Sequence, residues 1–250
     1  MLVLNDILIF VLGITGGIVG SISGGYGLIS IPILLLLGIP PHVALGISNF
    51  GGIGSRIGNL IKFYQHKNIG VSWKDILILT LISVPATIIG AKLVISVDPE
   101  SLTKIMGAVL LILLPLMFSK RDLGVKEDRA KGSKRIGAHI LFFICRVWSG
   151  FFSPGSGLIE TYIKMKAYGY TILQGKAVTR IPHILADLGG VIVFIVAGFM
   201  NWRYAIIMFI GMLIGGYFGM GFAIKKGDAW LKPIIGVIII TTAIKMIFFG

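Results

Sequence analysis

The sequence predicts an all-helical protein that crosses a membrane several times. Of its 250 residues, 56% are hydrophobic and only 13% are charged, against about 25% charged in soluble domains. The apolar residues come in long runs rather than in alternation, and no Asp, Glu, Lys or Arg occurs from Ile7 to Ser55. Such runs are typical of membrane helices and not of membrane β-barrels. This composition excludes a soluble enzyme and a disordered chain, and the single Cys145 excludes a scaffold of internal disulfides.

Glycine, proline and charged residues divide the chain into eight apolar segments, and a helix needs about 20 residues to cross a bilayer. The first segment is interrupted by the glycines of 24–27, and the fifth is interrupted at 153–157, where Pro154 removes a backbone donor. Whether these interruptions are broken helices or re-entrant hairpins stays open. The segments are, in order, about 7–37, 41–64, 73–95, 102–118, 136–167, 171–199, 202–224 and 230–249.

Charge divides the chain into three parts. Lys and Arg number 23 and Asp and Glu 10, and the densest polar stretch is 119–135. We expect a first transmembrane repeat at 1–118, a basic cytoplasmic linker at 119–135 and a second repeat at 136–250, in a multi-pass protein of the plasma membrane. The linker has no interleaved aromatic residues, so nucleic acid is not an expected partner. No Lys or Arg precedes the first apolar run, so a cleaved signal is not expected.

The two halves show an internal similarity. At an offset of 130, Gly25 and Gly27 fall on Gly155 and Gly157, and at an offset of 131 Ser48 falls on Thr179, among other matches. Repeats of this kind are characteristic of secondary transporters, whose substrate site lies where the halves meet. An even number of crossings per half makes the repeats parallel and an odd number makes them inverted, and the sequence leaves this choice open.

The two glycine-rich interruptions are candidate binding loops. Freed backbone N–H groups in a membrane need a partner, and at the start of a half-helix they form an anion site. The candidate residues are Ser23, Gly24, Gly25, Tyr26 and Gly27 in the first half and Ser153, Gly155, Ser156 and Gly157 in the second. The isolated glycines are expected to allow close helix packing; they are Gly13, Gly90, Gly211, Gly215, Gly216 and Gly219.

A polar group follows each interruption. It comprises Ser48, Asn49 and Arg56 in the first half and Thr179, Arg180, His183 and Asp187 in the second. Charged side chains inside a membrane face the protein interior and usually have a partner. We therefore expect Arg56 and Arg180 to bind an anion, and Asp187 to pair with one of the two.

Three ionisable residues are candidates for proton coupling: Glu160, His183 and Asp187. Pairing with Lys164, one helical turn on, is the favoured role for Glu160. His183 is as readily a simple hydrogen-bonding residue as a proton carrier. We expect Lys164 itself to lie at the membrane interface, together with Lys166 and Lys176.

Enzymatic motifs are missing from the sequence. It holds no HExxH, no cysteine pair and no GxxxxGK[ST], so neither a metal, nor another cofactor, nor ATP hydrolysis is expected. Ser, His and Asp occur in no nucleophile-elbow context. The chain is therefore not expected to be an enzyme.

Two glycine- and proline-bearing patterns resemble one family. They are Gly16-Gly17…Ser23-Gly24-Gly25-Tyr26-Gly27…Pro32 and Leu37-Gly38-Ile39-Pro40…Ala44-Leu45-Gly46-Ile47-Ser48, with a degenerate copy in the second half. In this order they resemble the TauE/SafE family of sulfite exporters, also described as the 4-toluene sulfonate uptake permease group. The resemblance covers nearly the whole chain outside the linker. It implies transport of a small sulfur-containing anion: sulfite, thiosulfate, sulfoacetate or another sulfonate.

We therefore expect a secondary transporter that exports such an anion by alternating access. The substrate would lie between the Gly25 and Gly155 interruptions, where Arg56 and Arg180 neutralise its charge. A proton-coupled uptake permease for a sulfonate or thiosulfate is the alternative, and an anion channel or an intramembrane enzyme represents another class. The oligomeric state stays open, a homodimer included.

Overall fold

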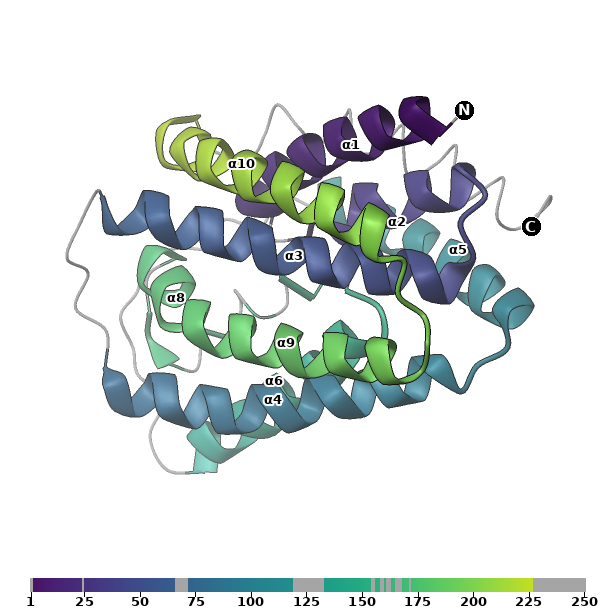
Figure 1. The fold of residues 1–250 in the computed structure, drawn as a ribbon. Coiled ribbons are helices and arrows are strands. Elements are labelled where there is room, and N and C mark those ends of the chain that lie inside the picture. Colours follow the sequence, from purple (N-terminus) through teal and green to yellow (C-terminus); the bar gives the residue numbers. More distant parts are fainter. Residues whose placement is uncertain are drawn as a thin grey trace.

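The described part of the chain is helical, as predicted. The structure is a computed structural model that describes residues 2–23, 25–65, 72–118, 133–153, 156–157, 160, 163–164, 168–170 and 172–226. No strand occurs among these residues. The helices are α1 (Leu2–Ser23), α2 (Gly27–Leu36), α3 (Pro41–Tyr64), α4 (Trp73–Ile95), α5 (Pro99–Phe118), α6 (Ser133–Phe151), α8 (Ile172–Val178), α9 (Arg180–Val196) and α10 (Trp202–Lys226), shown in Figure 1.

Helix boundaries follow the predicted segments in most places. The first segment is broken between α1 and α2, and α6 ends at Phe151, just before the second predicted interruption. The segment predicted at 171–199 is not continuous, because α8 and α9 are separate at Thr179. Pro182 lacks the N–H that would bond the carbonyl of Val178, which explains this division. The predicted helix at 230–249 and linker residues 119–132 lie outside the described residues.

Three described segments are long and apolar enough to cross a membrane by length and composition: Val3–Ser21, Trp73–Ile95 and Trp202–Phe222. Helix α3 has 24 residues but is not among them, because its glycines and polar residues lower its hydropathy. Helix α9 has only 17 residues. Helices α3 and α9 carry the polar groups predicted to follow the two interruptions.

The first of two sets of helices consists of α1, α3 and α10, in which α10 packs along both others. A Cβ on Gly13 would lie 3.0 Å from the Cα of Gly211, and a Cβ on Gly17 would lie 2.8 Å from the N of Gly216. The residue numbers rise on both helices from the first pair to the second, so α1 and α10 run parallel. Their backbones touch through glycine, which confirms the packing role predicted for the isolated glycines.

The second set consists of α4, α6 and α9, in which α4 packs along both others. Arg135 bonds Asp75 at 2.8 Å near the start of α6 and α4, and a Cβ on Gly90 would lie 2.9 Å from the carbonyl carbon of Gly150 near their ends. Helices α4 and α6 therefore run parallel. Figure 1 shows α9 running in the same direction as α4, opposite to α3 and α10.

The two sets meet where α3 crosses α9. Arg56 contacts Asp187, and further along α3 the carbonyl of Asn59 accepts a hydrogen bond from Arg180, which lies earlier on α9. A later residue of α3 thus contacts an earlier residue of α9, so these two helices are antiparallel. Arg56 of α3 and Arg180 and Asp187 of α9 meet at this contact.

Replacement of Gly90 by Ala should destabilise the fold. The new Cβ would overlap the backbone of α6 at Val147 and Gly150, and overpacking of this kind costs about 1–3 kcal/mol. Cys145 is buried and is the single cysteine of the chain, so the temperature at which it reacts with a thiol dye measures unfolding. We expect a lower midpoint for Gly90→Ala.

Gly137→Ala is the matched control, because a Cβ at this α6 position meets nothing within 4 Å. It should leave the midpoint unchanged or raise it slightly, since Ala favours helix over Gly. An equal fall in both variants would contradict the close packing of α4 on α6.

Candidate functional site

A polar cavity of about 110 Å³ lies where the two sets of helices meet. A volume of this size has room for a few waters or one small polyatomic ion. Side chains from α1, α3, α6, α9 and α10 line it, together with the segment after α6. The predicted site residues that it brings together are Tyr26, Arg56, Ser153, Ser156, Gly157, Glu160, Thr179, Arg180 and His183.

Arg56 of α3 binds across to α9. Its Nε lies 2.5 Å from Asp187 Oδ2 and its Nη2 lies 3.3 Å from Oδ1, a two-pronged ion pair. Its Nη1 lies 2.9 Å from His183 Nδ1. Of the two partners predicted for Asp187, the structure selects Arg56. The arginine faces the interior and does not snorkel outward.

Arg146 of α6 is a site residue that sequence reasoning missed. It is only 1% exposed, and its Nη2 contacts Thr87 Oγ1 at 2.8 Å and Asp187 Oδ1 at 3.4 Å. Its Nη1 lies 3.2 Å from Glu160 Oε1. Asp187 therefore bridges two arginines, one from each set of helices. The sequence did hold a signal for this residue, because Arg146 is a basic residue inside the apolar segment predicted at 136–167.

Glu160, His183 and Lys164 form the other half of the charge cluster. Glu160 Oε2 lies 2.8 Å from His183 Nε2 and 3.9 Å from Lys164 Nζ. The predicted Glu160–Lys164 pair is present, but His183 and Arg146 lie closer to the carboxylate. Because an arginine only donates, His183 Nδ1 accepts from Arg56, so the neutral ring holds its proton on Nε2, toward Glu160.

Lys164 does not lie at the interface, so that expectation was wrong. The residue is 4% exposed and its Nζ donates to Thr179 Oγ1 at 3.2 Å. The position of Lys164 after a glycine-rich break and near a turn favoured the interface, but the chain folds back into the cavity there. The side chains of Lys166 and Lys176 lie outside the described ones.

Arg180 stands at the end of the cavity toward the C-terminus of α3. Its Nη1 donates to the carbonyl of Asn59 at 2.6 Å, and its guanidinium carbon lies 3.7 Å from the centre of the Phe63 ring. Its Nη2 approaches Met220 Sδ at 3.9 Å. These contacts hold the cation beside the cavity through a carbonyl and an aromatic face.

Two predicted residues lie just behind the cavity rather than on its wall. Ser48 is fully buried and shares a 2.6 Å hydrogen bond with Ser30 of α2. Asn49 Oδ1 lies 3.5 Å from the hydroxyl of Tyr26, which does reach the cavity. Both residues therefore hold α2, and with it Tyr26, against α3.

Two amides in the first turn of α2 bond to carbonyls of the first glycine-rich interruption. The N–H of Leu28 donates to the carbonyl of Gly25, and that of Ile29 donates to the carbonyl of Tyr26, both at 3.2 Å. Gly27 begins α2. The remaining predicted residues of the two loops, the Ser23 side chain, Gly24 and Gly155, lie outside the described residues.

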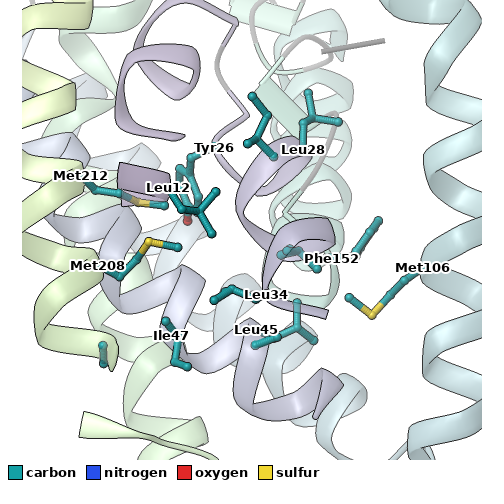
Figure 2. Close-up of a cluster of buried hydrophobic side chains, with 14 of the residues drawn as sticks. Leu12, Tyr26, Leu28, Leu34, Leu45, Ile47, Met106, Phe152, Met208 and Met212 are labelled. Atoms are coloured by element: carbon teal, nitrogen blue, oxygen red, sulfur yellow. The ribbon is translucent and has the colours of Figure 1, made fainter. Parts of the chain in front are cut away.

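Beyond Tyr26 the cavity gives way to a hydrophobic cluster, shown in Figure 2. The cluster includes Leu34, Leu45, Phe152 and Met208. Along α3, the cluster occupies the first half of the helix, and the cavity begins at Ser55. Apolar packing therefore separates the cavity from the end of the molecule at which α3 begins.

The two ends of the molecule differ in charge. Where α3 ends and α4 and α6 begin, the helices carry Lys62, Lys74, Lys134, Arg135, Lys225 and Lys226 against Asp75. We call this the basic end. At the opposite end, Lys92, Lys104 and Arg203 balance Asp6, Asp98 and Glu100. There the N–H of Ser101 donates to Asp98 and holds the pKa of that carboxyl below its usual range.

The chain matches the family described as sulfite exporter TauE/SafE over residues 9–246. It belongs to the TauE/SafE family. A "Probable membrane transporter protein ORF9" of Sinorhizobium is 26% identical over 96% of this chain and 91% of its own length. "Probable membrane transporter protein YdhB" of Bacillus subtilis is 27% identical over 92% and 96%.

Haemophilus influenzae has a TauE/SafE relative, named "Probable membrane transporter protein", that is 23% identical over 96% of this chain and 94% of its own length. No solved structure matches significantly. The family and these names make the chain a multi-pass membrane transporter rather than an enzyme. Among the described residues, no group of three His, Cys, Asp or Glu is placed to hold a metal.

Asp187→Asn should destabilise the TauE/SafE fold strongly. The substitution leaves Arg56 and Arg146 to share an amide in place of a carboxylate, and removal of one partner of a buried ion pair costs about 3–5 kcal/mol. The midpoint of thermal Cys145 labelling should fall by more than in Gly90→Ala. The Asp6→Asn control breaks an exposed pair with Arg203 and should change little.

Proposed function

We propose that this chain exports a small sulfur-containing oxyanion or organosulfonate, of the sulfite, thiosulfate or sulfoacetate type, across the plasma membrane. The observation that carries the proposal is a polar cavity with more cations than carboxylates on its walls. Arg56 and Arg180 would neutralise the substrate. The hydroxyls of Ser153, Ser156 and Thr179 would donate hydrogen bonds, those of Ser156 and Thr179 by turning from the carbonyls of Ser153 and Gly175 that they now bond. The inside-negative potential assists export of an anion by about 2.3 kcal/mol per charge per 100 mV.

The arrangement of helices supports two inverted repeats at 1–118 and 136–250. The 131-residue offset carries α1 onto α6, α3 onto α8 and α9, and α4 onto α10. Each helix runs opposite to its counterpart, as an inverted repeat requires. The third helix is exchanged between halves, since α10 packs on α1 and α3 while α4 packs on α6 and α9. Alternating access then follows from one set rocking against the other.

The basic end supports a cytoplasmic position for that face and for the 119–135 linker, because Lys and Arg gather on the cytoplasmic side of membrane proteins. Arg56 lies only eight residues, or about 12 Å along a helix axis, from the end of α3 at Tyr64. The cavity is thus nearer the cytoplasm, and the hydrophobic cluster of Figure 2 closes the outer side. An exported substrate would enter at Arg180.

One contact favours proton-coupled uptake as the second candidate. His183 stands between Arg56 and Glu160, with Nδ1 2.9 Å from Arg56 Nη1 and Nε2 2.8 Å from Glu160 Oε2. Entry of an anion past this pair could be linked to protonation of Glu160 or His183, and Asp187 holds both arginines in place. Uptake insensitive to a pH gradient would leave export as the better proposal.

Arg56→Gln and Arg180→Gln should each lower the initial rate of transport at least about tenfold, the equivalent of about 1.4 kcal/mol. The assay is a panel of labelled sulfite, thiosulfate, sulfate and sulfoacetate in proteoliposomes. Lys104→Gln is the control, because Lys104 is exposed on α5 and paired with Glu100. Parent-like rates in both arginine variants would remove the proposed site.

Orientation can be tested with two serines that flank α4. Ser72 precedes Trp73 at the basic end and Ser96 follows Ile95 at the other, and both are exposed. In a Cys145→Ser background, a membrane-impermeant maleimide should label Ser96→Cys on intact cells and Ser72→Cys only after permeabilisation. The reverse pattern would place the basic end outside.

A further inference from the structure

We infer that the cavity selects divalent over monovalent anions and that Lys164 sets this selectivity. The inference rests on the proposed function, since it specifies the charge of the transported substrate. It separates inorganic dianions such as thiosulfate from singly charged sulfonates.

Four cations and two carboxylates form the charge cluster of the described residues. Arg146, Lys164 and Arg180 are buried and Arg56 is 20% exposed at its side chain, while Glu160 and Asp187 are buried. The arginines stay protonated under all conditions, and Lys164 adds a fourth positive charge. The cluster therefore carries an excess of two positive charges, which one divalent anion cancels.

No other acidic residue is available within the apolar segments. Asp6, Asp75, Asp98 and Glu100 lie at or near helix ends, and Asp122, Glu127, Asp128 and Asp228 belong to the polar stretches of the sequence. Asp75 has its own partners, Arg135 and the hydroxyl of Tyr170. Among the described residues no further carboxylate balances the cluster, and an anionic ligand would supply the missing charge.

The contacts within the cluster also leave donors for such a ligand. Arg56 and Arg146 share Asp187, and Arg146 and Lys164 share Glu160. Arg146 Nε is buried without a hydrogen-bond partner among the described residues. The ammonium of Lys164 has three N–H donors, of which one reaches Thr179 and another faces Glu160 at 3.9 Å.

Lys164 is the residue whose charge can be removed at the least structural cost. Glu160 keeps His183 at 2.8 Å and Arg146 at 3.2 Å without it. A glutamine at this position can still bond Thr179. Loss of Arg56 or Arg146, by contrast, would take a partner from Asp187. Substitution of Lys164 thus changes the charge of the cavity, while the ion pairs of Glu160 and Asp187 with the arginines remain.

The experiment compares thiosulfate, which is divalent at neutral pH, with methanesulfonate, which is monovalent. Calorimetric titration of the purified protein gives a dissociation constant for each. The parent should bind thiosulfate at least about tenfold more tightly. Lys164→Gln should bring the ratio to within about threefold, because loss of one cation weakens a divalent anion more than a monovalent one. Lys164→Arg retains the charge and should keep the parent ratio, as should Lys104→Gln.

Equal binding of the two anions by the parent, or an unchanged ratio in Lys164→Gln, would overturn the inference while leaving an anion carrier intact. Binding of neither anion would overturn the proposed function as well. Arg180→Gln supplies a second variant should Lys164→Gln fail to fold, as judged by Cys145 labelling. It removes one charge from the opposite side of the cavity and must also lower the ratio.

Discussion

The ion pairs on Asp187 are the interaction on which the rest of the structure depends. Two arginines, one from each set of helices, share this one buried carboxylate where α3 crosses α9. Buried charges are costly unless they are paired closely and hydrogen-bonded, so α3, α6 and α9 have to approach within side-chain reach. The glycine contacts along α4–α6 and α1–α10 allow that approach, because backbone rather than side chains forms the helix surfaces.

The same pairing explains why the cavity is both charged and stable. Each carboxylate is shared by several cations, so the cluster holds together while some positive charge remains unmatched. A hydrophobic cluster lies on one side and the Arg180–Phe63 contact on the other.

The sequence predicted much of the fold and about half of the site. The bounds of α3 and α4 follow directly from proline, tryptophan and charged residues. The 131-residue offset pairs Arg56 with Asp187 in the sequence, and these two side chains also meet in the structure. Arg146 and Lys164 were missed because their burial depends on which helices become neighbours. Helix α10 packs on α1, which lies nearly 200 residues earlier in the chain. The periodic pattern of apolar residues within a helix does not reveal such a distant neighbour. The break at Thr179 was missed although Pro182, three residues further on, was a signal for it in the sequence.

Helix α10 packs on α1 and α3, and helix α4 packs on α6 and α9, so the order of synthesis bears on how the protein assembles. Helix α10 is synthesised long after α1 and α3, so the glycine faces of these two helices have no protein neighbour until residues 202–226 leave the ribosome. Helix α4, in turn, enters the membrane before either of its partners. The first half therefore cannot mature as a unit. Assembly has to wait for nearly the whole chain, and a nascent chain stopped before α10 would be a natural substrate for membrane quality control.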